Sequence, residues 1–207
     1  MSDIWDYFGL NKKDFPGAYV NRYGADGELL IVGTGRNVWE EVRGLPQARH
    51  VMCVNDMGMY WPGYVKHWYS NDVEQLIHWD KGRRRPHVAM YGGGWGLHSC
   101  FKREGPEYEN VNYWPFPGHG SSGLVSILVA LGMGYTNITV AGVPLDNSGH
   151  FYDPPNNHQM RFESRPWTNF ENETTDRIIE RTLPLMKHKV YPLSGRLREA
   201  LRPYHGT

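Results

Sequence analysis

The stretch GHGSSGLVSILVALGMGYTNITVAGVPLD, residues 118–146, decides the fold of this chain. A loop of small residues precedes an almost wholly apolar run, glycines end that run, and a β-branched segment then leads into a polar loop. This order predicts a buried helix followed by a β-strand. Small residues at a helix start let backbone amides approach an anion, so Ser121, Ser122 and Gly123 predict a site for a phosphate-bearing ligand. Either serine would also act as a plain helix cap.

The rest of the chain repeats this alternation of strands and helices. Strands are predicted at 28–32, 51–54, 65–69, 87–91, 138–140 and 190–191, with a weaker one at 111–114 in an otherwise irregular stretch, 94–117. Helical spacing of apolar residues appears between most of them and again at the C-terminal end. The pattern predicts an α/β fold with a single Rossmann-like, doubly wound and mostly parallel sheet.

The chain is predicted to divide into two segments, the second of which contains a lid. Residues 1–27 are predicted to form an N-terminal arm that packs on the domain or on a second copy of the chain, which would make a homo-oligomer. Residues 28–207 form the Rossmann-like nucleotide-binding domain. Residues 143–167 hold four prolines and are predicted to form a lid loop over the ligand.

Composition limits the partners and the compartment. The 22 basic and 22 acidic side chains cancel, so no overall field attracts nucleic acid or an anionic membrane. Cys53 lies in an apolar run, and two cysteines make no disulfide framework, which favours a reducing, cytoplasmic compartment. No apolar run approaches the ~18 residues that span a membrane, and the first residues lack the pattern of a signal peptide.

Polar residues follow the first two predicted strands. Gly33-Thr34-Gly35 begins like a dinucleotide-binding turn, but Val38 stands where that fingerprint needs Gly or Ala. A shortened nucleotide-binding turn, or a purely structural turn, therefore fits better than an NAD site. Asp56 follows the second strand, where a ribose-binding acid would sit.

The lid carries candidate catalytic groups. An imidazole of His150 or His158 has a pKa near working pH and could take a proton from an attacking hydroxyl, although either can be an ordinary loop histidine. Asp146 and Asp153 could bind Mg²⁺ beside a diphosphate, or could form turns next to glycine and proline. The histidines, His98 among them, lack metal-ligand spacing, so no protein-bound metal is expected.

Four places then carry a resemblance: residues 31–35, residues 54–56, residues 69–71, and the pattern that runs from Ser121 through Gly142 to Tyr152. With these motifs the chain resembles the bacterial sialyltransferases that use CMP-sialic acid, and the related Rossmann-like proteins that include methanopterin-type pyrophosphokinases. Asp56 stands where that family tends to carry an amide, and Asp146 where another lid tyrosine is expected. The resemblance therefore extends to a nucleotide-linked donor more than to sialic acid itself.

The resemblance implies a glycosyltransferase-like enzyme that moves a sugar from a nucleotide-sugar donor to a hydroxyl acceptor, with inversion and without a metal or other cofactor. It implies His158 as the catalytic base, with His150 in reserve, and Tyr152 at the leaving phosphate. The donor and nucleotide contacts expected from the motifs and the resemblance together are Gly33, Thr34, Gly35, Asn55, Asp56, Asn71, Ser121, Ser122, Gly123, Asp146 and Tyr152.

Two other interpretations stay open. A Mg²⁺-dependent pyrophosphokinase or nucleotide hydrolase would use Asp56 and Asp146 as metal ligands. A non-catalytic nucleotide-binding protein would use the same loops and the N-terminal arm as a docking segment. Nucleic acid enters as a partner only if it is the acceptor of the transferred sugar.

Overall fold

Seven strands form one sheet in the order β5-β4-β3-β2-β1-β6-β7, and every neighbouring pair is parallel. The structure is a computed structural model and describes residues 4–11, 28–48, 50–83, 96–100, 108, 111–116, 121–146, 148–153 and 169–205, with the side chains of 169–173 left aside. Within these residues the strands are β1 (Glu28–Val32), β2 (His50–Val54), β3 (His67–Tyr69), β4 (Gly96–Ser99), β5 (Val111–Tyr113), β6 (Asn137–Ala141) and β7 (Val190–Pro192).

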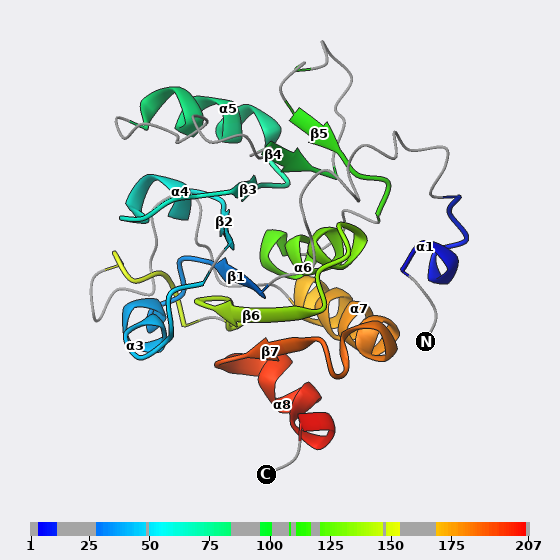
Figure 1. Ribbon diagram of the computed structural model, residues 1–207. Coiled ribbons are helices and arrows are strands. Elements are labelled where there is room, and N and C mark those ends of the chain that lie inside the picture. Colours follow the sequence, from blue (N-terminus) through cyan, green and yellow to red (C-terminus); the bar gives the residue numbers. More distant parts are fainter. Residues whose placement is uncertain are drawn as a thin grey trace.

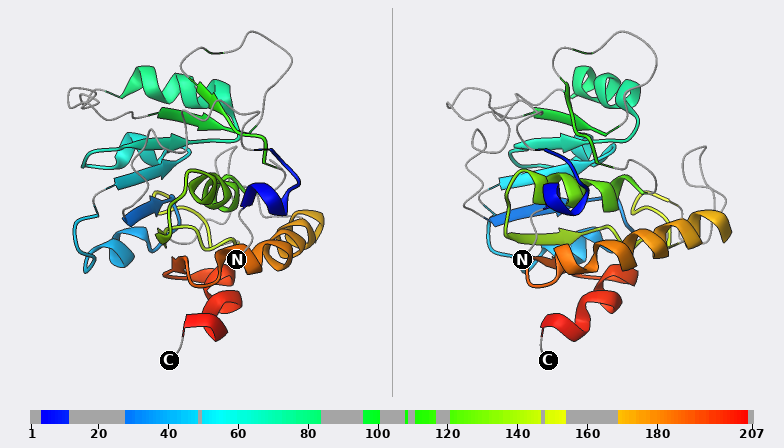
Figure 2. Two further views of the ribbon diagram at one scale, coloured as in Figure 1. Left: turned by 45° about the vertical axis from the view of Figure 1, so that its right-hand side comes forward. Right: turned by 90° about the vertical axis from the view of Figure 1, so that its right-hand side faces the viewer.

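Helices cover both faces of the sheet (Figure 1). They are α1 (Ile4–Tyr7), α3 (Val38–Val42), α4 (Met57–Tyr60), α5 (Val73–Gly82), α6 (Ser122–Gly132), α7 (Asn169–Met186) and α8 (Gly195–His205). Helices α3, α4 and α5 lie on one face, and the right-hand view of Figure 2 looks onto the other face, which α1, α6 and α7 cover. The prediction of a Rossmann-like, doubly wound α/β fold is confirmed.

Alternate side chains of each strand enter different cores. In β1, Leu29 and Ile31 pack under α6, while Leu30 and Val32 pack under α3. Successive side chains of a strand point to opposite faces, and both faces of this parallel sheet are covered by helices. β1 and β2 are therefore nearly continuous apolar runs, as their sequences indicated.

The chain reverses direction across the sheet at β1. It moves outward from β1 through β2, β3 and β4 to β5, and α6 then returns it to β6 on the other side of β1. Every residue of α6 from Gly123 to Gly132 is buried, which confirms the buried helix predicted from its all-round apolar sequence. The carboxyl ends of β1 and β6 therefore flank the topological switch point, where ligands of such sheets usually bind.

The first part of the predicted arm packs on the domain. Trp5 of α1 is 3% exposed, and its ring lies 5.2 Å from that of Phe116 and 6.3 Å from that of Trp114, between ring centroids. Residues 1–3 and 12–27 of the arm lie outside the described residues.

The fourth strand differs from the prediction. Residues 87–91, predicted as a strand, lie outside the described residues, whereas β4 falls in a stretch expected to be irregular. Its sequence, Gly-Leu-His-Ser, has no apolar alternation, so periodicity does not reveal it. Pairing with β3 and β5 and hydrogen bonds to the buried His98 hold the strand instead. Across the described helices, none is long and apolar enough to cross a membrane.

A chain of buried polar side chains crosses the core from the amino ends of β2 and β3 to β4 and the residue after β5. Its contacts are Lys66 Nζ to His50 Nε2 (2.9 Å), His50 Nδ1 to Tyr135 OH (2.8 Å), Tyr135 OH to His67 Nε2 (3.0 Å), His67 Nδ1 to His98 Nε2 (3.1 Å) and Trp114 Nε1 to His98 Nδ1 (3.1 Å). We call these six residues the buried polar chain. It ties the segment after α6 to β2, β3 and β4.

The tryptophan at one end sets the proton positions in the adjoining histidines. An indole N–H only donates, so His98 accepts at Nδ1 and, as a neutral ring, donates from Nε2 to His67. Burial lowers the pKa of His98 to about 3. Burial also lowers the pKa of His67 well below its usual value, and the proximity of His98, Lys66 and His50, which disfavours a second positive charge, lowers it further. Both rings are therefore neutral in the folded protein.

We expect the free energy of unfolding to fall as the pH drops from 7.5 to 5.0. The unfolded chain binds protons at His67 and His98 near pH 6.5, but the folded chain does not, so acid favours unfolding. Well below pH 6.5 each histidine contributes a slope of up to about 1.4 kcal/mol per pH unit. Urea unfolding at each pH measures this slope.

A His98→Gln variant is the matched control. It should be less stable than the wild type at pH 7.5, because it breaks the buried polar chain, yet its stability should depend less on pH. Equal stability of the wild-type protein at pH 7.5 and pH 5.0 would contradict the assignment of neutral, buried histidines.

Candidate functional site

The carboxyl ends of β1, β2 and β3 meet the start of α6 at one edge of the sheet. Because these strands are parallel and adjacent, the loops that follow them open at the same edge. Most of the predicted site residues lie there, in two neighbouring groups. Asn55 and Asp56 are consecutive in the chain, and they belong to different groups.

The first group, the amide group, consists of Asn55, Ser70, Asn71 and Ser122. The Ser70 hydroxyl donates to Asn55 Oδ1 at 2.9 Å, and the backbone N–H of Asn71 donates to Ser122 Oγ at 3.3 Å. Asn55 has a φ of 52°, a left-handed conformation that asparagine tolerates better than most residues. The ends of β2 and β3 are thereby joined to the first turn of α6.

The start of α6 is capped and tightly packed. Ser121 is the N-cap, and its Oγ accepts from the backbone N–H of Gly123 at 3.2 Å. A Cβ on Gly123 would lie 2.3 Å from Cγ1 of Val143, so no other residue lets the helix start approach the loop after β6. The cap is thus one of the two roles expected for Ser121 and Ser122, and a ligand would add to it.

The turn after β1 is bound to the loop after β6. The N–H of Gly33 donates to Ala141 at 2.9 Å, and that of Gly35 donates to Gly142 at 2.8 Å. Gly142 has a φ of 64°, and its own N–H donates to Glu41 Oε2 at 2.7 Å. The backbone amides of Gly33 and Gly35 therefore already have acceptors within the protein.

The second group, the lid group, begins where the lid crosses the turn after β1. Thr34 Oγ1 lies 2.6 Å from His150 Nδ1, and the Phe151 N–H donates to the Thr34 carbonyl at 2.9 Å. Gly35 and His150 also form an antiparallel bridge. Asp153 Oδ2 accepts from the His150 N–H at 2.6 Å. The His150 ring is therefore held at the ligand edge.

The lid then reaches the end of β2. The Tyr152 hydroxyl donates to Asp56 Oδ2 at 2.8 Å, and the Tyr152 ring stacks on His150 with centroids 5.1 Å apart. Thr34, His150, Tyr152 and Asp56 thus form one connected lid group. All four were predicted as site residues, but the sequence did not indicate which of them contact one another.

Burial and charge act together on this group. Burial raises the pKa of Asp56, while the Tyr152 hydrogen bond and the nearby His150 oppose that rise. Burial also raises the pKa of Tyr152, and the negative charge of Asp56 adds to the effect. The tyrosine consequently stays a hydroxyl that donates, and the carboxylate is partly removed from water. Carboxyl groups whose pKa values are shifted are typical of functional sites.

Two further predicted residues lie apart from these groups. Asp146 is exposed, and its Oδ1 accepts from the Ser148 N–H at 2.8 Å, which is the turn-forming role. His158 lies outside the described residues. Among the described part of the chain, no three His, Cys, Asp or Glu side chains are grouped to hold a metal ion.

One site residue was missed by sequence reasoning. Tyr60 is the last residue of α4, its ring is 46% exposed, and its centroid lies 5.5 Å from that of Tyr152. The available signal was the spacing Asp56 to Tyr60, since residues four apart share a helix face. The short helix α4 itself was not predicted, so this signal was not used.

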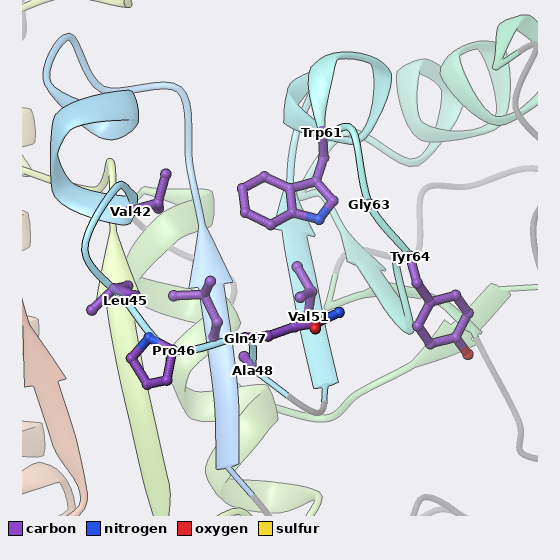
Figure 3. A pocket seen from close by; sticks show the side chains of 10 residues that line it. Val42, Leu45, Pro46, Gln47, Ala48, Val51, Trp61, Gly63 and Tyr64 are labelled. Atoms are coloured by element: carbon purple, nitrogen blue, oxygen red, sulfur yellow. The ribbon is translucent and has the colours of Figure 1, made fainter.

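A separate apolar cavity lies on the α3 and α4 face of the sheet (Figure 3). Its volume is about 260 Å³, and it is lined by Leu30, Val42, Leu45, Pro46, Gln47, Ala48, Val51, Trp61, Gly63 and Tyr64. None of these residues belongs to the amide group or the lid group. Trp61 on its wall stacks with Trp39, which contacts Phe151 of the lid, so an aromatic row connects the two regions.

Comparison of the chain with protein-family models, with curated proteins and with solved structures gives no match. The Rossmann-like class is therefore established by the sheet itself, and the function has to be argued from the site.

We expect Gly142→Ala to lower the free energy of unfolding by about 2–4 kcal/mol, because the new Cβ would meet both strain at positive φ and a crowded backbone. That atom would lie 2.5 Å from the Gly33 carbonyl oxygen and 2.7 Å from Val38 Cγ2. Gly44→Ala is the control, since a Cβ there meets nothing within 4 Å. Urea unfolding of both variants measures the difference, and equal stabilities would contradict the close approach.

Proposed function

We propose that this protein is a glycosyltransferase-like enzyme that transfers a sugar from a nucleotide-sugar donor to a hydroxyl acceptor, by an inverting mechanism without a metal. The observation that carries the proposal is the joining of Asn55 and Asn71 to the start of α6 through Ser70 and Ser122. Amides, hydroxyls and a helix N-terminus that converge in this way suit the oxygens of a sugar phosphate.

In the proposed reaction a histidine takes the proton of the acceptor hydroxyl. The acceptor oxygen then forms a bond to the anomeric carbon, and the bond from that carbon to the phosphate oxygen breaks. The phosphate leaves with the electron pair, and the backbone amide and hydroxyl of Ser122 at the start of α6 stabilise its charge. Attack from the side opposite the leaving phosphate inverts the anomeric centre.

The roles proposed for the lid residues combine the resemblance with the contacts of the described residues. His158 is the preferred base by resemblance, and His150 is the reserve, held by Thr34 and Asp153 at the ligand edge. Tyr152 donates to Asp56 in this structure, so we assign it to orienting that carboxylate and assign the leaving phosphate to the start of α6.

The magnesium-dependent alternative receives less support from the geometry. It needs Asp56 and Asp146 on one ion, but Asp56 is engaged by Tyr152 and the exposed Asp146 caps the Ser148 amide. Catalysis by a pyrophosphokinase or nucleotide hydrolase of this kind would stop in EDTA, whereas the proposed transfer would not.

We expect nucleotide to raise the melting temperature of the protein. A thermal-shift screen with CMP, UDP, GDP, ADP and NAD measures this, because ligand at 100 times its Kd adds about 2.7 kcal/mol to stability. Stabilisation by a ribonucleotide with turnover of the matching nucleotide sugar supports the transferase. Stabilisation without turnover identifies a non-catalytic binding protein, and no shift with any of the five probes contradicts the proposal.

We expect substitution of the catalytic base to lower transfer or donor hydrolysis by at least about 100-fold. His158→Ala and His150→Ala are compared at equal protein concentration, with nucleotide binding as the control that the fold and the donor site remain. If both variants keep more than a hundredth of wild-type activity, neither histidine is the base.

A further inference from the structure

Tyr60 and Asp56 form a pair at the outer side of the lid group. Asp56 immediately precedes α4 and Tyr60 ends it, so both side chains come from the same helical turn. The Tyr60 ring is exposed, and it packs edge-on against Phe151 with centroids 5.2 Å apart and at a tilt against Tyr152. An exposed aromatic ring therefore lies beside Tyr152, whose hydroxyl donates to the Asp56 carboxylate.

The carboxylate of Asp56 is held in a defined orientation. Its Oδ2 accepts from the Tyr152 hydroxyl, and the tyrosine ring is itself stacked on His150. A carboxylate has about four lone-pair sites on its two oxygens, so the bonds from Tyr152 and from the backbone N–H of Asp56 leave it able to accept from further donors. The neighbouring Asp153 is buried and engaged by the His150 N–H.

We propose that Asp56 and Tyr60 bind a neutral, polyhydroxylated sugar ring: the carboxylate accepts from two adjacent hydroxyls, and the tyrosine covers the ring's C–H face. Aromatic rings are large, rigid apolar surfaces, and hydrogen bonds to a charged acceptor are stronger than neutral ones. This position has two carboxylates, Asp56 and Asp153, and only one imidazole, that of His150, near it. The excess of negative charge disfavours an anionic ligand group there.

The desolvation of the carboxylate agrees with this assignment. Burial raises the pKa of Asp56, which shows that the charged form has lost part of its water. Hydroxyl donors of a sugar would replace that water without adding a charge. A cation is the other partner of a carboxylate, but the described residues group no three metal-ligating side chains.

This inference rests on the proposed function, and it names the chemistry that one side of the site recognises. The ring has two sources. It is the ribose of the donor nucleotide, because Asp56 follows the strand next to β1, or it is the sugar that accepts the transferred group, because the Tyr60 ring faces solvent.

The test measures binding by titration calorimetry in the wild type, Asp56→Asn and Tyr60→Ala. Tyr60→Phe keeps the ring, and Glu199→Gln removes an exposed carboxylate on the distant α8; both are matched controls. The probes are CMP, UDP, GDP and ADP with their 2′-deoxy counterparts, the neutral disaccharide lactose, and the anionic 3′-sialyllactose.

If the ring is ribose, wild-type protein binds a ribonucleotide at least about tenfold more tightly than its 2′-deoxy form, and Asp56→Asn removes the difference. If the ring belongs to the acceptor, lactose binds more tightly than 3′-sialyllactose, and both Asp56→Asn and Tyr60→Ala weaken lactose at least about tenfold. The control variants behave as the wild type in either case.

The inference is overturned if nucleotides bind the wild type, Asp56→Asn leaves any preference for the 2′-hydroxyl unchanged, and neither Asp56→Asn nor Tyr60→Ala weakens lactose binding. That result leaves the proposed function intact. If no nucleotide binds, the proposed function fails instead, and the lactose arm alone decides the inference. Tyr60→Ala changes an exposed side chain, so it reports on the site even where Asp56→Asn fails to fold.

Discussion

The close approach of two backbones at the switch point of the sheet is the constraint on which the site depends. A Cβ at Gly33 would lie 2.4 Å from the carbonyl oxygen of Gly142, so the turn after β1 touches the loop after β6 directly. The amides of Gly33 and Gly35 are accordingly bound to the backbone carbonyls of Ala141 and Gly142. The polar groups that remain at the carboxyl edge lie farther along the sheet, at the ends of β2 and β3, and that is where the start of α6 meets them.

Helix α6 connects this edge to the opposite end of the sheet. Its first turn carries Ser122, and the segment after its last turn carries Tyr135, which the buried polar chain ties to His50 and His67. Interiors are closely packed and transmit displacement, so a helix held at both ends by hydrogen bonds cannot shift along its axis without breaking one set. The buried polar chain therefore has a structural role that extends to the site through α6.

The sequence predicted the elements with strong periodicity and missed those held by polar contacts. The apolar helix α6 and the β-branched strands could be predicted, because elements that are buried on both faces need apolar sequences. β4 and α4 are short and weakly apolar, and they exist because neighbouring strands and loops hold them. The site residues at strand ends were predictable from topology, since parallel strands end at one edge. The pairing of Thr34 with His150 and of Asp56 with Tyr152 was not, because it depends on how the lid folds back.

The two groups of the site differ in charge, and this difference follows from the neighbouring positions of Asn55 and Asp56. Asn55 belongs to an uncharged set of amides and hydroxyls beside the positive end of α6, which favours negative oxygens. Asp56 faces the lid, where its carboxylate, Asp153 and His150 surround the Tyr152 ring. A ligand that spans both groups must therefore carry its charge on one side and neutral hydroxyls on the other. A sugar phosphate has this arrangement, whereas a free diphosphate would place negative charge against Asp56.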